Sequence, residues 1–191
     1  MYPTLVRDAR FHGFQLKADL AILAEARKEA CEVCGEALHV SHYERKPRGG
    51  LPDLGPEHGV RFSLCCANRE CRTRHTPPSL RFLGRRVYLG AVVVLVSAMQ
   101  HGATPARMRR IRELVGVSRR TVERWREWWR AVFPESRCWR EAAGRFVPAV
   151  ETGRLPASLL ERFLGDEQAR LVALLRLLGP LTGGATPGHA G

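Results

Sequence analysis

The chain has no apolar run long enough to cross a membrane. Its longest such run, residues 88–99, has 12 residues, whereas a membrane-spanning helix needs about 20. The N-terminal sequence MYPTLVRDARF also lacks the apolar stretch of a secretory signal peptide. We therefore expect a cytoplasmic location and no membrane partner.

Acidic residues are scarce where basic residues are dense. The chain carries 31 Lys and Arg against 19 Asp and Glu, which gives a formal net charge of +12 and a pI near 10.5. Residues 69–130 alone hold 15 arginines and only 4 acidic residues. A localised basic surface is the electrostatic footprint of a polyanionic partner. This distribution predicts a polyanionic partner; together with the helix pattern of residues 105–129 described below, it leads us to expect double-stranded DNA as that partner and a nucleoid-associated location.

The composition is otherwise that of an ordinary folded protein. Hydrophobic residues make up 45% and charged residues 26% of the 191 residues, both usual values. No Cys-His-Asn or Ser-His-Asp arrangement is evident, so a nucleophilic enzyme has little support. We expect no catalytic residues. The cysteine and helix patterns described below predict a fold that is mainly α with a small β zinc ribbon, a three-helix helix-turn-helix core and short C-terminal helices.

Clustered cysteines predict a structural zinc ion. In a reducing compartment, such clusters indicate a metal before disulfides. Cys31 and Cys34, followed by a glycine, form a C-x2-C zinc knuckle, and Cys66 and Cys71 form a second, wider pair. Four thiolates leave no open position on the metal, so the Zn²⁺ would be structural rather than catalytic. Its binding would supply folding free energy on the order of 10 kcal/mol.

Cys65 competes with Cys66 for one ligand position. Residues 60, 62, 64 and 66 share one strand parity, which places Cys66 on the same side as the apolar residues. The predicted ligands are therefore Cys31, Cys34, Cys66 and Cys71, with Cys65 as the substitute. Histidines that could replace a sulfur are His39, His42, His58 and His75. Buried, unligated cysteines are the main alternative.

Residues 105–129, PARMRRIRELVGVSRRTVERWREWW, predict two helices joined by a tight turn. Pro105 opens the first helix, because proline at this position gives up an N–H that would be unpaired anyway. Gly116 ends that helix, and Ser118 caps the next one through its hydroxyl. The helices of the expected helix-turn-helix unit span residues 85–101, 105–115 and 118–132.

The second of these helices has two different faces. Val122, Trp125 and Trp129 lie on one face, and arginines lie on the other. A recognition helix points its N-terminal residues at base edges in the major groove, where arginine pairs with guanine. The candidate DNA contacts here are Arg107, Ser118, Arg119, Arg120, Glu123 and Arg124. The alternative is an amphipathic helix whose charged face is simply solvated.

The remaining segments complete the expected organisation. The basic connector over residues 72–82 offers Arg72, Arg74 and Arg81 as phosphate contacts, or it holds ribbon and helices in a fixed orientation. A helix is expected over residues 14–30, irregular chain over 135–154, and two helices over 156–165 and 166–178. The expected units are a helical lead-in (1–30), the zinc ribbon and connector (31–82), the DNA-binding domain (83–133), a C-terminal helical segment (134–182) and a disordered tail (183–191).

These features together resemble the N-terminal DNA-binding region of bacterial insertion-sequence transposases. The matching residues are the C-x2-C-G knuckle at 31–35, the C-x4-C pair at 66–71, the segment 73–82 and the Gly-Val-Ser turn at 116–118. The sequence is also similar to small bacterial proteins with a CRxRxTPPSxRFxGRRVY signature, which travel with mobile elements. The wide second knuckle departs from the transposase pattern.

The resemblance does not extend to a nuclease domain. Transposases of this kind cut DNA with three carboxylates on an α/β domain, whereas the acidic residues after position 134 are not placed on alternating strands. We therefore expect an accessory protein, a repressor or a transposase remnant. Its partners would be DNA and either a transposase or a second copy in a homodimer. A host transcription regulator and a protein–protein adaptor are the alternatives.

Overall fold

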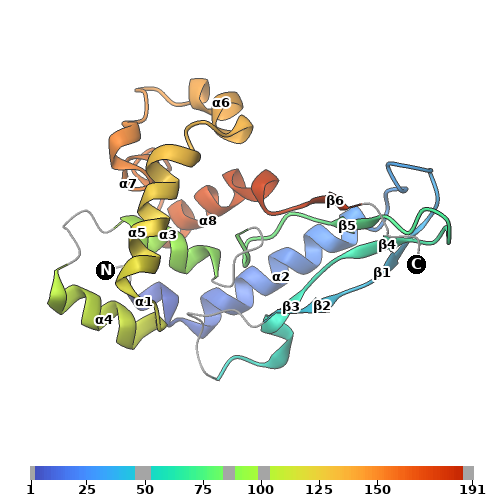
Figure 1. The fold of residues 1–191 in the computed structure, drawn as a ribbon, viewed down its shortest axis with the longest axis horizontal. Coiled ribbons are helices and arrows are strands. Elements are labelled where there is room, and N and C mark those ends of the chain that lie inside the picture. Colours follow the sequence, from blue (N-terminus) through green and yellow to red (C-terminus); the bar gives the residue numbers. More distant parts are fainter. Residues whose placement is uncertain (1–2, 46–52, 84–88, 99–103, 187–191) are drawn as a thin grey trace.

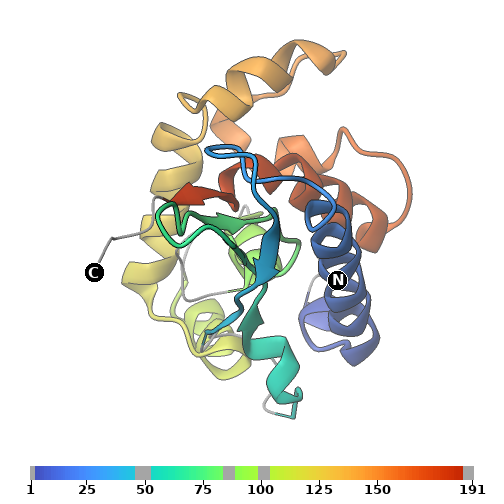
Figure 2. The same ribbon diagram turned by 90° about the vertical axis from the view of Figure 1, so that its right-hand side faces the viewer.

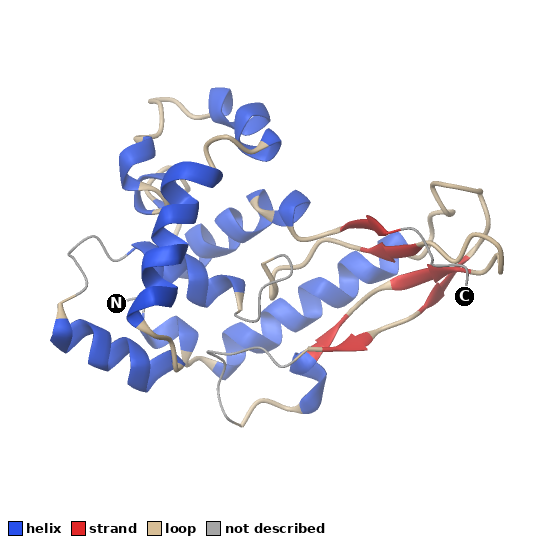
Figure 3. Ribbon diagram, in the orientation of Figure 1, coloured by secondary structure: helices blue, strands red, loops and turns tan. Residues whose placement is uncertain are grey.

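The computed structural model describes residues 3–45, 53–83, 89–98 and 104–186. About half of the chain is helical, and the strands form small antiparallel sheets. The sheets gather at one end of the molecule and most helices at the other, with α2 (Ala9–Ala26) running between them (Figures 1 and 3). The coarse expectation of a helical protein with a small β part is therefore confirmed.

Eight α-helices lie in the described ranges. Besides α2 they are α1 (Pro3–Val6), α3 (Gly90–Ala98), α4 (Pro105–Val115), α5 (Arg119–Glu127), α6 (Arg137–Ala142), α7 (Ala157–Leu160) and α8 (Glu167–Leu177). A π-helical turn, Trp128–Val132, continues α5, and 3-10 turns occur at Pro56–Gly59, Ala143–Arg145, Thr152–Arg154 and Gly179–Leu181. In the part of the chain that can be described, no helix is long and apolar enough to cross a membrane.

Within the described residues, six short strands form two antiparallel sheets. The larger sheet has the order β1-β4-β5-β6, made of β1 (Leu38–Val40), β4 (Leu64–Cys66), β5 (Arg74–Thr76) and β6 (Gly184–Thr186). The smaller one pairs β2 (Tyr43–Glu44) with β3 (Val60–Arg61). Figure 2 views these strands from the sheet end of the molecule, with α2 beside them.

The prediction of a disordered tail from residue 183 is wrong for its first residues. Gly184, Ala185 and Thr186 pair with the three residues of β5. The segment carries no large apolar side chain, so its order comes from backbone hydrogen bonds to an existing sheet edge. Residues 187–191 lie outside the described residues.

Two apolar cores meet along α2. The larger core is built around α3, whose nine residues are all buried, and α3 packs against α5 and α8. The smaller core lies in the ribbon and contains Leu38, Phe62 and Leu64. Because α2 gives Phe11 to the larger core and Leu23 to the smaller one, this helix fixes the ribbon relative to the helices.

A buried ion pair strengthens this connection. Arg81 and Asp19 are 2% and 1% exposed, and Arg81 Nε lies 2.9 Å from Asp19 Oδ2. The carboxylate also accepts hydrogen bonds from the Ser79 hydroxyl (2.6 Å) and the Leu80 N–H (2.7 Å). The prediction of Arg81 as a phosphate contact is therefore wrong. Its guanidinium instead holds the connector against α2. This agrees with the alternative that the connector fixes the orientation of ribbon and helices.

Several element boundaries differ from those expected. Helix α2 begins at Ala9 rather than residue 14, because Asp8 caps it by accepting a hydrogen bond from the Arg10 N–H (2.8 Å). Helix α6 lies within a stretch expected to be irregular, where Ser136 caps it and Trp139 is buried. The sequence predicts a helix over residues 85–101. The structure describes residues 89–98 of this stretch, and Gly90–Ala98 form α3. The expected helix ends, at residues 85 and 101, lie outside the described residues.

Candidate metal centre

Four cysteine sulfurs converge at the end of the ribbon. The Sγ atoms of Cys31, Cys34, Cys66 and Cys71 all lie within 4.8 Å of one another. Cys31 Sγ is 3.8 Å from Cys71 Sγ, and Cys34 Sγ is 3.4 Å from Cys66 Sγ. Tetrahedral zinc with Zn–S bonds of about 2.3 Å requires sulfurs about 3.8 Å apart. The cluster can therefore hold a metal ion such as zinc, and the predicted set of four cysteines is confirmed as a cluster.

The first knuckle is a tight loop closed by backbone hydrogen bonds. It follows α2, and the Cys31 N–H donates to the Glu36 carbonyl (2.8 Å) while the Gly35 N–H donates to the Cys31 carbonyl (2.8 Å). Gly35 has a φ of +76°, a conformation that glycine adopts without steric cost. The loop thus turns its two sulfurs toward the second half of the site.

The wider second knuckle closes in the same way. The Cys66 N–H donates to the Thr73 carbonyl (2.9 Å). Thr73 is the second residue after Cys71, just as Glu36 is the second residue after Cys34. Arg72 takes the place of Gly35 with a φ of +46°, the one positive φ outside glycine in the described residues. The two additional residues are accommodated by a turn at Asn68, whose side chain accepts from the Glu70 N–H (2.9 Å).

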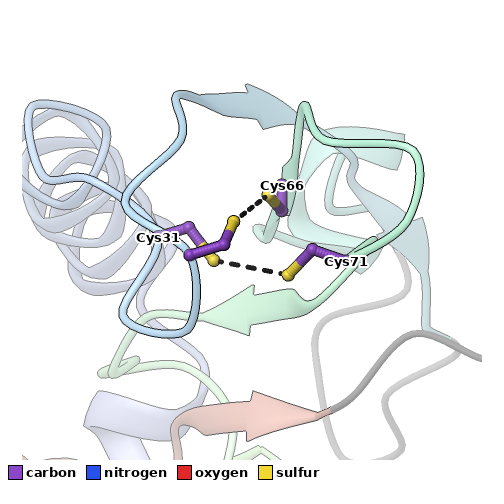
Figure 4. Close-up of side chains that lie close together, drawn as sticks. Cys31, Cys66 and Cys71 are labelled. Atoms are coloured by element: carbon purple, nitrogen blue, oxygen red, sulfur yellow. Dashed lines mark hydrogen bonds between the residues drawn. The ribbon is translucent and has the colours of Figure 1, made fainter.

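Figure 4 shows how separate segments supply the sulfurs. Cys31 comes from the loop after α2, Cys66 from β4, and Cys71 from the loop that leads to β5. Cys65 is adjacent to Cys66, but its Sγ donates to the Arg72 carbonyl (3.6 Å) and is not part of the cluster. The strand-parity argument therefore selected the right neighbour.

His75 lies beside the cluster without being a member of it. Its Nε2 is 3.3 Å from Cys31 Sγ, and its Nδ1 is 3.5 Å from a Glu32 carboxylate oxygen. Imidazole N–H groups that donate to metal-bound thiolates orient the ligand and reduce its charge. None of the four histidines considered as substitutes belongs to the four-sulfur cluster found among the described residues.

Burial and hydrogen bonding shift the pKa values of two cluster thiols in opposite directions. The Thr73 hydroxyl, 3.1 Å from Cys71 Sγ, lowers the pKa of Cys71 to about 6. Burial raises the pKa of Cys66 to about 12. A buried thiolate is therefore costly at Cys66 unless a cation lies next to it. A divalent metal would supply that charge and hold all four thiolates together.

The predicted DNA contacts on α5 lie on its outer side. Ser118 and the side chains of Arg119, Arg120, Glu123 and Arg124 are all exposed. Arg119 Nε is 2.7 Å from Glu123 Oε1, so these two side chains form an exposed ion pair.

The remaining predicted contacts are scattered. Arg72 is exposed beside the metal cluster. Arg74 is half-buried and donates to the Ser41 carbonyl (2.7 Å) and the Ser63 hydroxyl (2.9 Å). Arg107 belongs to α4, and its side chain lies outside the described part of the structure.

Comparison of the chain with protein-family models, with curated proteins and with solved structures found no match in any of the three. The function must therefore be argued from this chain's own residues.

Proposed function

We propose that the chain is a zinc-dependent, sequence-preferring DNA-binding protein associated with a transposable element. In this proposal α3, α4 and α5 act as a helix-turn-helix unit, and the chain has an accessory or repressor role, or is a transposase remnant, without nuclease activity. The observation that carries the proposal is the exposed arginine face of α5, opposite a face formed by large buried side chains.

The two faces of α5 are sharply divided. Val122 and Trp125 of α5, and Trp129 of the π-helical turn that continues it, are each at most 1% exposed. Arg120 and Arg124 are exposed and form no ion pair within the described residues. Arginine guanidinium groups match the acceptors of guanine in the major groove, and each good bidentate pair contributes about 1–3 kcal/mol of discrimination. The buried face would fix the helix axis, and the outer face would read the bases.

The turn before α5 has the features that a recognition helix requires. Gly116 has a φ of +64° and ends α4. Val117 is fully buried between the helices, and Ser118 caps α5 by accepting a hydrogen bond from the Thr121 N–H (3.3 Å). The helix therefore starts at a fixed point with its N-terminal turn exposed, which is the end that meets base edges in helix-turn-helix proteins.

Zinc would contribute by fixing the ribbon. The ribbon core is small, and two of its six buried members are the cluster residues Cys31 and Cys66. A metal bound there supplies folding free energy that so few apolar side chains cannot provide. Because Leu23 of α2 belongs to the same core, loss of the metal would also loosen the helix that joins ribbon and helices.

The salt dependence of duplex binding tests the proposal. If about five arginines neutralise phosphates, log K falls with log salt with a slope of about −4.5. We expect Arg124→Ala to relax sequence preference, whereas Arg72→Ala weakens binding to all duplexes alike. A chain with no duplex affinity at physiological salt would contradict the proposal and favour a protein–protein adaptor. A host promoter as the preferred target, rather than a transposon end, would favour a transcription regulator.

A further inference from the structure

A cavity between the ribbon and the C-terminal segment contains a buried arginine. The cavity has a volume of about 440 Å³ and is lined by Tyr43, Arg45, Arg61, Thr76 and residues 181–186. Its volume lies within the usual range for small-molecule sites. No carboxylate belongs to this lining within the described ranges.

Arg61 is buried without an anionic partner. It is 2% exposed, and it donates to the carbonyl groups of Pro77 (2.6 Å) and Thr182 (2.8 Å). No carboxylate forms an ion pair with it among the described residues, and Asp19, the carboxylate whose charge acts on it, is already bonded to Arg81. A buried charge is costly unless an opposite charge compensates it. Burial accordingly lowers the pKa of Arg61.

A second arginine, Arg45, also lines the cavity. The Arg45 guanidinium carbon lies 5.2 Å from the centroid of the Tyr43 ring, and that of Arg74, which is not part of the lining, lies 5.5 Å from the same centroid. Arg45 is therefore held in place by an aromatic ring, and no carboxylate among the described residues forms an ion pair with it. Two guanidinium groups that line one cavity, those of Arg45 and Arg61, provide the usual recognition chemistry for phosphate.

The C-terminal segment forms the far wall. Thr182 accepts from Arg61 through its carbonyl and from the Ser79 N–H (2.8 Å) through its hydroxyl. Gly183 lies so close to β5 that a Cβ there would be 2.6 Å from the Thr76 carbonyl oxygen. Only glycine allows the backbone at position 183 to approach β5 this closely, so Gly183 is required for this wall of the cavity.

A second basic cavity in the molecule is different. It has a volume of about 320 Å³ and is lined by Arg126, Arg130 and Arg154 among other residues. Arg154 forms ion pairs with two glutamates, at 3.2 and 2.8 Å. Its positive charge is therefore partly compensated within the protein, unlike that of Arg61.

We propose that the cavity around Arg61 binds a phosphate group, supplied either by a free nucleotide or by a nucleic-acid backbone. The phosphate oxygens accept from Arg45 and Arg61, and the hydroxyls of Thr76 and Thr186 provide further donors on paired strands. This inference concerns the ribbon and does not depend on base reading by α5.

Titration calorimetry of the zinc-loaded full chain with inorganic phosphate, at constant ionic strength against chloride, tests the site. We expect one phosphate per chain, and Arg45→Gln should weaken its affinity at least about tenfold, because charge-assisted hydrogen bonds are lost. Arg145→Gln removes an exposed charge elsewhere and should leave the affinity unchanged. Absence of saturable binding, or equal affinity in wild type and Arg45→Gln, overturns the proposal.

The source of the phosphate is identified by competition. If saturating duplex DNA of random sequence displaces inorganic phosphate, the site holds a backbone phosphate. If ATP displaces it and the duplex does not, the site is for a nucleotide. Both results support the anion site, and neither depends on whether α5 prefers a sequence.

Discussion

The buried pair of Asp19 and Arg81 allows a quantitative prediction. Asp19→Asn keeps the size of the side chain but removes its charge, leaving Arg81 buried at 2% exposure without a counter-charge. The new amide must also point its NH₂ group at the Arg81, Ser79 or Leu80 donors that now surround the carboxylate. Breaking a buried pair on one side costs about 3–5 kcal/mol, a large part of a typical total stability of about 5–15 kcal/mol.

Urea unfolding of the zinc-saturated chain measures this cost. With a slope of about 2–3 kcal/mol/M, the unfolding midpoint should fall by about 1–2.5 M. Asp166→Asn is the matched control, because Asp166 is an exposed N-cap of α8 and asparagine caps a helix as well as aspartate. A loss of less than about 1 kcal/mol in Asp19→Asn, equal to that of the control, would refute the reasoning that this pair fixes the connector to α2.

Three further predictions concern the metal and the turn. Cys34→Ser should lose bound zinc, whereas Cys65→Ser should retain one zinc per chain, as measured by elemental analysis of the purified protein. Lowering the pH below neutrality should release the metal, because protons compete for the thiolates, and circular dichroism should show the ribbon unfolding with the release. Ser118→Ala should cost about 1 kcal/mol in chemical unfolding because α5 loses its cap, whereas Ser118→Asp should restore it.

Each of these predictions has a contrary result. Full zinc content in Cys34→Ser, or its loss in Cys65→Ser, would show that the ligand set is wrong. Ribbon structure that survives release of the metal would show that the apolar core alone suffices. A Ser118→Ala protein as stable as wild type would show that the Ser118 hydroxyl does not stabilise the start of α5.

The sequence predicted features that depend on local spacing. Within each pair the two cysteines are close in sequence, and strand parity distinguished Cys66 from Cys65, because each of these signals extends over only a few residues. The same holds for α5. Its cap was predicted from the serine at position 118, and its buried Trp125 from the helical spacing of apolar residues. These interactions are encoded within one or two turns of chain, so a reader of the sequence can find them.

Long-range partners could not be predicted in this way. Arg81 belongs to a basic segment, and nothing near it indicates Asp19, which lies 62 residues earlier. The strand at Gly184–Thr186 has the composition of a flexible tail, and its order depends on an edge supplied by β5. In both cases the decisive group is distant in sequence, so local composition indicated the wrong environment.

The most direct test of the central claim is a selection of duplexes from random-sequence DNA by the zinc-loaded chain, compared with selection by an Arg120→Ala/Arg124→Ala variant. We predict that the wild-type chain enriches a short site containing guanines, which α5 reads through these two side chains, and that the variant enriches no such site while its fold and zinc content are unchanged. Enrichment of the same site by both proteins, or of no site by the wild-type chain, would contradict it.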